Sequence, residues 1–572
     1  MLKRSLIGFI LVCLVALTVS PAAAVPVADL TALARFMPAN SDIFVSARID
    51  DGYIGVWDGL ARRLAAAFPD DFPRTTLTEQ LNLLSKPFGG EFQAVFRPWL
   101  GDTAALAIVD YGLLLDSRSS NDIDAILAAV AITDAAGAEA YFDGLNERDG
   151  MNVVKTRGET GVLYEFSRGE IRSLLIQDDV ILVGNLTEAN NRMARLADFD
   201  GFTDALMRLP ETDYNALLYI NYPSLMDALM FSSGFSGMGM DDLFGLLLQT
   251  TGSAALGFAI LDDRSFVADF TLAYDPSAVA EFYSLDEALL VQRPFDPAFA
   301  RFIPAGAPLA AFDNDLASGY QGSLAQLAGM SMFGMPDSTM PSDEVERMIE
   351  QVNFGLRGAT GLTLDELLGW MSGDYAIWMG LSEAAQSADS TVSLIAANPV
   401  EFGLLVDASV DPDAAAAAAR GLRRGFSTLA EIGSSGSTRL AVSDETIAEV
   451  EVAVLTITDR DLPFPVEIIV GANAELFVLG TRGAVEAAFN PGAGLDSDPA
   501  FQEALAFSLP GLQSLLYASG LGFLPLIDVL ESQLGSDADN VRTLLTLLSS
   551  SSGGTVYTDD SGLVRLVITL PE

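Results

Sequence analysis

The chain has 572 residues, no histidine and a single cysteine, at position 13. The absence of histidine excludes Ser-His-Asp and Cys-His catalysis, and it excludes zinc or haem sites that need an imidazole ligand. The formal net charge of −46 repels nucleic acid and anionic membrane surfaces, so we expect neither as a partner.

The N-terminus has the three-part layout of a secretory signal. Lys3 and Arg4 precede the apolar run 5–20, and the small residues at 22–24 predict cleavage after Ala24. We therefore expect 1–24 to be a signal peptide. The mature chain, with a net charge of −46 − 2 = −48, would be exported and be periplasmic, extracellular or associated with the cell envelope. Cleavage removes Cys13, so no disulfide can form. No later stretch predicts an integral membrane span in the mature chain.

In chain order, the first half of the mature chain alternates strands and helices. The residue patterns predict a strand at 43–49, a helix at 54–68, strands at 104–115 and 125–133, and a helix that begins at the acidic cap Asp134. Three strands follow at 153–155, 162–166 and 174–183, and a hairpin at 254–274 ends this half. Short turns between neighbouring strands favour antiparallel pairing, with the helices packed on the sheet.

The second half repeats the landmarks of the first half in the same order. ARFMPA at 34–39 recurs as ARFIPA at 300–305, EQLN at 79–82 as EQVN at 350–353, and WLGD at 99–102 as WMSGD at 370–374. A second hairpin, at 553–570, ends this half. The sequence therefore predicts an α+β fold of two tandem homologous halves, 25–292 and 298–572, each a mainly antiparallel sheet with helices packed on it. The segment RPFDP at 293–297 is typical of a linker.

The opening motif also carries a family resemblance. A signal peptide followed by LARFMPAN at 33–40 and the strand residues IFV at 43–45 is similar to a family of secreted bacterial proteins defined by a domain of unknown function, the DUF3352-type group. The resemblance implies no activity, cofactor or catalytic residue.

Carboxylate chemistry is what the composition leaves open. Asp560-Ser561-Gly562 fits the triplet of aspartic proteases, but that mechanism needs a second aspartate, and the matching hairpin of the first half reads DDRS at 262–265. Asp-Asp pairs occur at 50–51, 70–71, 178–179, 241–242, 262–263 and 559–560, and none forms a calcium-binding loop. Asp313-Asn314-Asp315 comes nearest and lacks the required glycine. We interpret these acids as turn and cap residues and expect no metal site or cofactor.

Two stretches rich in methionine and glycine, at 230–240 and 330–340, are unlike either core or turn. Flexible thioethers suit an adaptable apolar contact surface. The candidate hydrophobic-contact residues are Met238, Met240, Met330, Met332, Phe333 and Met335. Two alternatives stay open: Cu(I) binding by Met330, Met332 and Met335, or a loop that folds back on its own core.

The sequence favours a non-enzymatic binding or interaction protein of the bacterial cell envelope, because catalytic residue types are so sparse. Its partner would be a hydrophobic ligand, a peptide or an envelope protein. A carboxylate-dependent hydrolase of envelope sugars or peptides is one alternative. A structural envelope component is the other.

Overall fold

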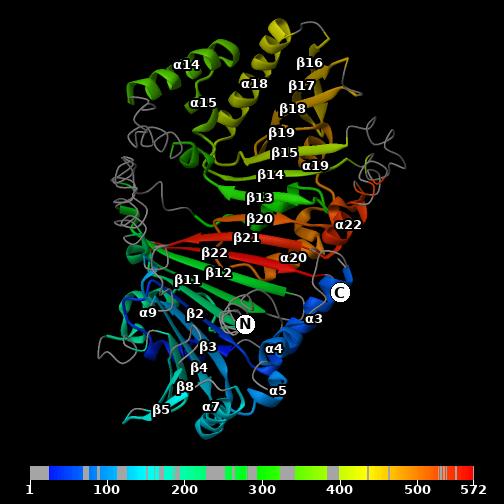
Figure 1. The fold of residues 1–572 in the computed structure, drawn as a ribbon. Coiled ribbons are helices and arrows are strands. Elements are labelled where there is room, and N and C mark those ends of the chain that lie inside the picture. Colours follow the sequence, from blue (N-terminus) through cyan, green and yellow to red (C-terminus); the bar gives the residue numbers. More distant parts are fainter. Residues whose placement is uncertain are drawn as a thin grey trace. The chain divides into compact units, whose positions relative to one another are not determined.

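A computed structural model gives the fold. It describes residues 25–67, 76–86, 90–112, 125–149, 153–159, 161–166, 173–184, 186, 194–226, 251–260, 265–277, 280, 293–321, 342–382, 385, 399–433, 437–460, 464–525, 527, 531, 535, 537–547, 550–558 and 560–570. The chain divides into unit 1, residues 1–275 with 560–563, and unit 2, residues 276–559 with 564–572. Both units combine helices with antiparallel strands (Figure 1), which confirms the α+β class.

The described strands of unit 1 form an antiparallel sheet. They are β2 (Ile43–Arg48), β3 (Leu100–Ile108), β4 (Ile126–Ile132), β5 (Val153–Arg157), β6 (Val162–Phe166), β7 (Ser173–Gln177), β8 (Val180–Gly184), β10 (Ala216–Ile220), β11 (Thr251–Ile260) and β12 (Ser265–Tyr274). Their order in space is β5-β6-β7-β8-β4-β3-β2-β10-β11-β12. The short strands β1 (Val25–Pro26) and β9 (Asp213–Tyr214) pair separately.

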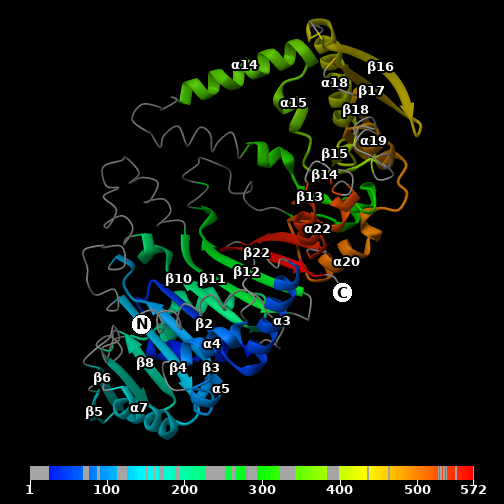
Figure 2. The ribbon, with the colours of Figure 1, turned by 45° about the vertical axis from the view of Figure 1, so that its right-hand side comes forward.

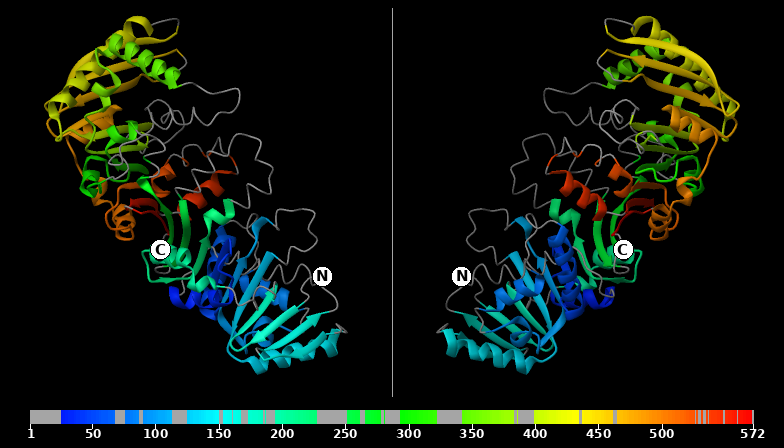
Figure 3. Two further views of the ribbon diagram at one scale, coloured as in Figure 1. Left: turned by 90° about the vertical axis from the view of Figure 1, so that its left-hand side faces the viewer. Right: turned by 90° about the vertical axis from the view of Figure 1, so that its right-hand side faces the viewer.

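Helices cover both faces of the unit 1 sheet. They are α2 (Val27–Thr31), the 3₁₀ helix η1 (Ala32–Phe36), α3 (Asp51–Ala67), α4 (Leu77–Ser85), α5 (Phe92–Val95), α7 (Ala135–Asp149), η4 (Leu196–Asp198) and α9 (Asp200–Met207). On one face Phe44 meets Phe202 of α9 edge to face, with ring centres 5.4 Å apart. On the other face Trp99 packs on Tyr141 of α7, a helix that Figure 3 shows beside strands β5–β8.

Unit 2 repeats the strand order of unit 1. Its strands are β13 (Leu309–Asn314), β14 (Asp374–Leu381), β15 (Val400–Asp407), β16 (Arg439–Ile447), β17 (Val450–Thr458), β18 (Val466–Ala472), β19 (Leu476–Gly480), β20 (Ser514–Ala518), β21 (Ser550–Tyr557) and β22 (Ser561–Thr569). The antiparallel order is β16-β17-β18-β19-β15-β14-β13-β20-β21, which matches unit 1 strand by strand. Because each strand is short and alternates in burial, this register fixes which side chains share a face.

The helices of unit 2 cover its sheet unequally. They are η7 (Pro297–Phe302), α14 (Ser342–Thr360), α15 (Leu364–Leu368), α18 (Pro412–Gly433), α19 (Arg482–Phe489), η8 (Leu495–Ser497), α20 (Pro499–Ala506), η9 (Leu521–Phe523) and α22 (Asp537–Leu547). One face packs on α20, where Phe501 meets Phe312 and Tyr517 with ring centres 5.6 and 5.1 Å apart. The other face packs on α18, which contacts all four strands β16–β19. Figure 2 shows α14 meeting α18 at one end and extending away from it.

The helix caps predicted from acidic residues are confirmed. Asp134 accepts a hydrogen bond from the Gly137 N–H at the start of α7, and Asp411 accepts one from the Ala414 N–H at the start of α18, both at 3.0 Å. Pro412 occupies the first position of α18, where its missing N–H leaves no helix bond unmade. The two predicted terminal hairpins are also present, as β11–β12 and β21–β22.

The prediction of a single strand at 174–183 is wrong, because the chain turns there. β7 ends at Gln177 and β8 begins at Val180, and the two pair antiparallel. Asp178 takes a left-handed backbone conformation, with a φ of 47°, which allows the tight turn. Aspartate tolerates this conformation better than most residues, so the turn needs no glycine or proline.

The segment 293–297, predicted as a linker, is packed within unit 2. Phe295 is buried and its ring stacks on Phe312 with centres 5.6 Å apart, while Asp296 caps η7. The boundary between unit 1 and unit 2 lies earlier in the chain, between Asp275 and Pro276. The predicted half boundaries, 25–292 and 298–572, concern sequence similarity and stay a prediction.

Candidate functional site

The six predicted hydrophobic-contact residues lie outside the described residues. This holds for Met238, Met240, Met330, Met332, Phe333 and Met335 alike. The methionine-rich contact surface therefore stays a prediction.

The aspartates that the structure describes from the singled-out pairs and triplets lie in caps, turns and strand ends. Asp50 caps α3, where it accepts a hydrogen bond from the Tyr53 N–H at 3.0 Å. Asp178 and Asp179 form the β7–β8 turn, and Asp560 accepts a hydrogen bond from Ser561 at the start of β22. The pairs at 70–71, 241–242 and 262–263, together with position 559, lie outside the described residues.

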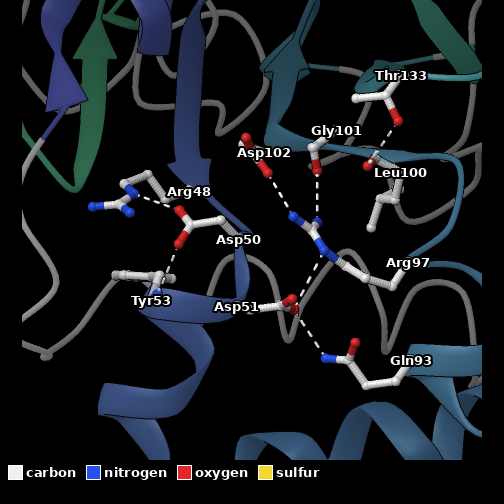
Figure 4. Close-up of polar contacts among 10 residues, drawn as sticks. All are labelled: Arg48, Asp50, Asp51, Tyr53, Gln93, Arg97, Leu100, Gly101, Asp102 and Thr133. Carbon is white, nitrogen blue, oxygen red and sulfur yellow. Dashed lines mark hydrogen bonds and ion pairs between the residues drawn. The ribbon is translucent and has the colours of Figure 1, made fainter.

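A polar cluster of unit 1 surrounds Arg97, between α5 and β3 (Figure 4). Its Nη2 lies 2.6 Å from Asp102 Oδ1, its Nε lies 3.3 Å from Asp51 Oδ1, and its Nη1 donates to the Gly101 carbonyl at 3.0 Å. Gln93 Nε2 also donates to Asp51, at 2.9 Å. The guanidinium is largely buried, and its planar fork suits three acceptors that come from different directions.

A second arginine pairs with the neighbouring acid. Arg48 Nε lies 2.6 Å from Asp50 Oδ2, and both side chains are mostly buried. Burial raises the pKa of Asp50, but the hydrogen bonds from Arg48 and from the Tyr53 and Gly52 N–H groups, together with the Arg48 charge, outweigh burial and leave this pKa below its usual value.

The Arg97 cluster is suited to holding loops together rather than to catalysis. Arg97 pairs with Asp51 and Asp102, and Arg48 pairs with the neighbouring Asp50, so all three carboxylates already bond to an arginine of the same chain. Within the described ranges, no group of three or more acidic, cysteine or histidine residues is placed to hold a metal ion. We did not single out Arg97 from the sequence, because its partners become neighbours only in the fold.

Among the described residues, four carboxyl groups elsewhere have a pKa raised by burial. Each has its own partner: Asp42 with Ser224, Asp313 with Tyr375, Asp374 with Arg293, and Glu401 with Thr481. A hydrolase of the aspartic type needs two carboxyl groups that share a proton. These four are instead hydrogen-bonded to hydroxyl groups or paired with an arginine.

The open part of the unit 2 sheet is apolar. We define the apolar strip as Ile377, Met379, Phe402, Leu516 and Leu566, whose exposed fractions are 53%, 37%, 40%, 53% and 53%. Ile377 lies opposite Ala311 of β13, which lies opposite Leu516 of β20. Directly opposite residues in an antiparallel pair point to the same face, so these side chains form one surface.

The remaining members of the apolar strip extend this surface at both ends. Met379 lies opposite Phe402 of β15, two residues along β14 from Ile377. Leu516 lies opposite Gly553 of β21, and a side-chain carbon of Leu566 in β22 lies next to that glycine. The apolar strip thus crosses the sheet from β15 to β22.

The matching row of unit 1 is mostly buried. The strand order places Leu106 at the position of Ile377 and Val45 at that of Ala311. Leu106 and Val45 each keep an exposed fraction of 8%. The third residue of the row, Leu218 opposite Val45, is half-buried. The two units therefore share a strand order but differ in how far this row is exposed to water.

The fold defines an antiparallel α+β protein with a large 20-stranded sheet in the described ranges; the two units of the chain share a strand order, and one of them carries the apolar strip. The chain belongs to the family described as protein of unknown function (DUF3352), whose model matches residues 5–422. That match covers more than two thirds of the chain and ends within α18. Comparisons with curated proteins and with solved structures find no match. None of the helices in the described ranges has the length and apolar character needed to cross a membrane.

Proposed function

We propose that the chain is an exported, non-enzymatic binding protein of the bacterial cell envelope, and that the apolar strip is its contact surface. The observation that carries this proposal is strand β14. Its residues alternate between Ala376 and Trp378 on the covered face and Ile377 and Met379 on the open face, so both faces are apolar. A strand that is apolar on both faces is typical of a sheet covered on both sides.

The energy of covering the apolar strip supports binding. Its five residues still expose between 37% and 53% of their surface. Removing the remaining apolar surface from water would yield about 1 kcal/mol per side chain. Contiguous exposed apolar surface of this kind is typical of an interaction site. The arginine-paired acids of unit 1, by contrast, give no comparable support to a hydrolase.

Export and duplication are parts of the same proposal. The basic, apolar and small-residue segments of 1–24 support export. The shared strand order supports a duplication, as do the equivalent isolated bridges Pro38–Arg195 and Pro304–Gly494, each of which follows the repeated ARF motif. The two units would then have diverged at the row that is more exposed in unit 2 than in unit 1.

The test is binding of a neutral apolar dye, such as Nile red, to the whole chain. A double variant, Ile377→Ser with Leu516→Ser, should weaken dye binding by roughly thirtyfold, since about 1 kcal/mol is lost at each position. The matched control is Leu83→Ser, which changes an equally exposed leucine (55%) on α4 of unit 1. Equal dye affinity of the double variant and the control would contradict the proposal that the apolar strip is the contact surface.

A further inference from the structure

The apolar strip continues a surface that a helix already covers. Val406 of β15 packs beneath α18, in one cluster with Phe426 of that helix. Phe402 lies on the same face of β15, four residues earlier, and is exposed. Tyr375 and Leu404 are half-buried at the margin of the α18 cluster, and Ile377 follows Tyr375 on the same face of β14. Covered and open surface therefore form one continuous apolar face.

The backbone of the open strands excludes an added peptide strand as the occupant. β14 pairs with β13 and β15, and β13 also pairs with β20, so their N–H and C=O groups are used within the sheet. The apolar strip itself offers only apolar side chains, and the polar groups nearest to it on this face, such as Asp313 with Tyr375 and Ser514 with Thr555, bond to each other. An occupant must therefore satisfy its own backbone, and a helix does so through its internal hydrogen bonds.

The dimensions of the apolar strip fit a helix of ordinary length. From β15 to β22 the strip crosses five strand spacings, which is about 24 Å at the usual separation of neighbouring strands. A helix of about 16 residues has this length. In the other direction the strip spans the two rows of Ile377 and Met379, about 7 Å apart along β14, which is within the width of one helix.

The net charge of the chain indicates which residues the bound helix should carry on its solvent-facing side. The apolar strip contains no charged residue, whereas the chain as a whole has a net charge of −46. This field repels a second copy of the chain and any acidic partner, and it attracts a basic partner.

We propose that the apolar strip binds an amphipathic helix of a partner protein, with apolar residues on one side and lysine or arginine on the other. This proposal rests on the proposed function, because it names the partner of the same surface. The partner helix would take the place over β14, β13 and β20 that α18 takes over β16–β19.

The experiment uses a labelled amphipathic peptide of leucine and lysine, about 16 residues long, with leucines three and four positions apart. Fluorescence anisotropy gives its affinity for the whole chain, and circular dichroism reports its helicity. One control peptide has the same composition in scrambled order, and another has glutamate in place of lysine. We expect the amphipathic lysine peptide to bind roughly tenfold more tightly than either control and to gain helicity on binding.

Variants locate the binding on the chain. The double variant Ile377→Ser with Leu516→Ser should weaken the binding of the amphipathic peptide by roughly tenfold, because it removes apolar contact surface. The affinity for the scrambled peptide should stay unchanged, because the substitutions alter no charge. Leu83→Ser should change neither affinity. All substituted positions are exposed, so folding is expected to be retained, and far-ultraviolet circular dichroism of each variant checks this.

Three outcomes would overturn the helix proposal. Equal affinity for the amphipathic and the scrambled peptide would mean that charge attraction alone explains the binding. Strip-dependent binding of Nile red or of a neutral long-chain alcohol, without strip-dependent peptide binding, would leave the proposed function standing and assign the strip to an alkyl ligand. Dimers in size-exclusion chromatography that disappear in the double variant would assign it to a second copy of the chain.

Discussion

Arg35 donates to both carboxylate oxygens of Asp179, at 2.7 and 2.6 Å, while its guanidinium lies 4.7 Å from the centre of the Phe36 ring. In unit 2, Arg301 lies 2.5 Å from Glu475 and 4.4 Å from the ring of the phenylalanine that follows it. Each acid lies just before the strand that ends a hairpin, β8 in unit 1 and β19 in unit 2. The arginine of the repeated ARF motif thus ties a 3₁₀ helix to the same hairpin turn in both units.

These ion pairs position the turns more than they stabilise the units. Arg35 and Asp179 expose about half or more of their side chains, so solvent screens their attraction. A double-mutant cycle with Arg35→Ala and Asp179→Ala should give a coupling free energy of about 0.5 kcal/mol in urea unfolding, falling further in high salt. The same cycle on Arg301 and Glu475 should agree. A coupling of about 2 kcal/mol or more would show that the pair is a main source of stability.

Arg97 should matter much more than any one of its partners. Arg97→Ala removes the arginine donor of the Gly101 carbonyl, Asp51 and Asp102, and leaves Asp51 with Gln93 alone among the side chains of this cluster. We therefore expect a loss of about 2 kcal/mol in the free energy of unfolding. Asp102→Ala should lose less than about 1 kcal/mol, because Asp102 is mostly exposed. Arg97→Lys should retain only part of the stability that Arg97→Ala loses, since an ammonium group lacks the planar fork that reaches three acceptors. Equal losses for Arg97→Ala and Asp102→Ala in urea unfolding would contradict this account.

Gly257 is a position where packing, rather than backbone conformation, requires glycine. A Cβ there would lie 2.4 Å from the Tyr214 ring, which is fully buried and fixed by the 2.8 Å hydrogen bond from its hydroxyl to Asp269. Gly257→Ala should therefore lower the free energy of unfolding by about 1–3 kcal/mol, as overpacking does. Gly55→Ala, on a helix where a new Cβ meets nothing, is the control and should be neutral or stabilising. Thermal unfolding of both variants provides the measurement.

Local chemistry explains which elements the sequence could predict. The caps at Asp134 and Asp411 depend on residues within three positions, so the sequence contains the whole interaction. The β7–β8 turn was missed because Asp178 and Asp179 interrupt an apolar run without the glycine or proline that usually marks a turn.

The apolar strip could not be predicted in the same way. The apolar residues of β14 are visible in the sequence, but Ile377 is exposed because α18 mainly contacts β16–β19 and its cluster reaches β14 only at Tyr375. Which strands a helix covers is decided by connections between distant segments. The Arg97 cluster has the same origin, since Asp51 and Asp102 approach this arginine from opposite sides in sequence.

The ionised form of Asp50 should stabilise the folded chain at pH values above its pKa. Its folded pKa lies below its ordinary value of 3.8, so the unfolded chain binds the proton more readily. The stabilisation is therefore complete above about pH 4 and is lost as the pH falls through the folded pKa. Asp50→Asn should be less stable than the parent at pH 7, and the difference should shrink below pH 4. A difference that stays constant down to about pH 2 would show that hydrogen bonding alone, without charge, explains the effect.

The contribution of Asp313 to the free energy of unfolding should depend on pH in the opposite direction. Burial raises its pKa, against the hydrogen bonds from the Asn314 N–H and the Tyr375 hydroxyl, so the folded chain binds the proton more readily. Its contribution is then most favourable below about pH 4 and declines as the pH rises through the folded pKa. Asp313→Asn keeps an acceptor for the Tyr375 hydroxyl and removes the charge, so it should match or exceed the stability of the parent at pH 7.

Tyr375 provides a second, independent measurement of the same pair. Burial, together with the Asp313 charge and hydrogen bond, raises the pKa of Tyr375 to about 12. In Asp313→Asn the pKa of Tyr375 should fall, because a neutral amide does not oppose the phenolate charge. Spectrophotometric titration of the parent and the variant measures this difference. An unchanged titration would mean that burial alone controls Tyr375, and the stability gain of Asp313→Asn at pH 7 would then have to come from Asp313 desolvation without any coupling between the two groups.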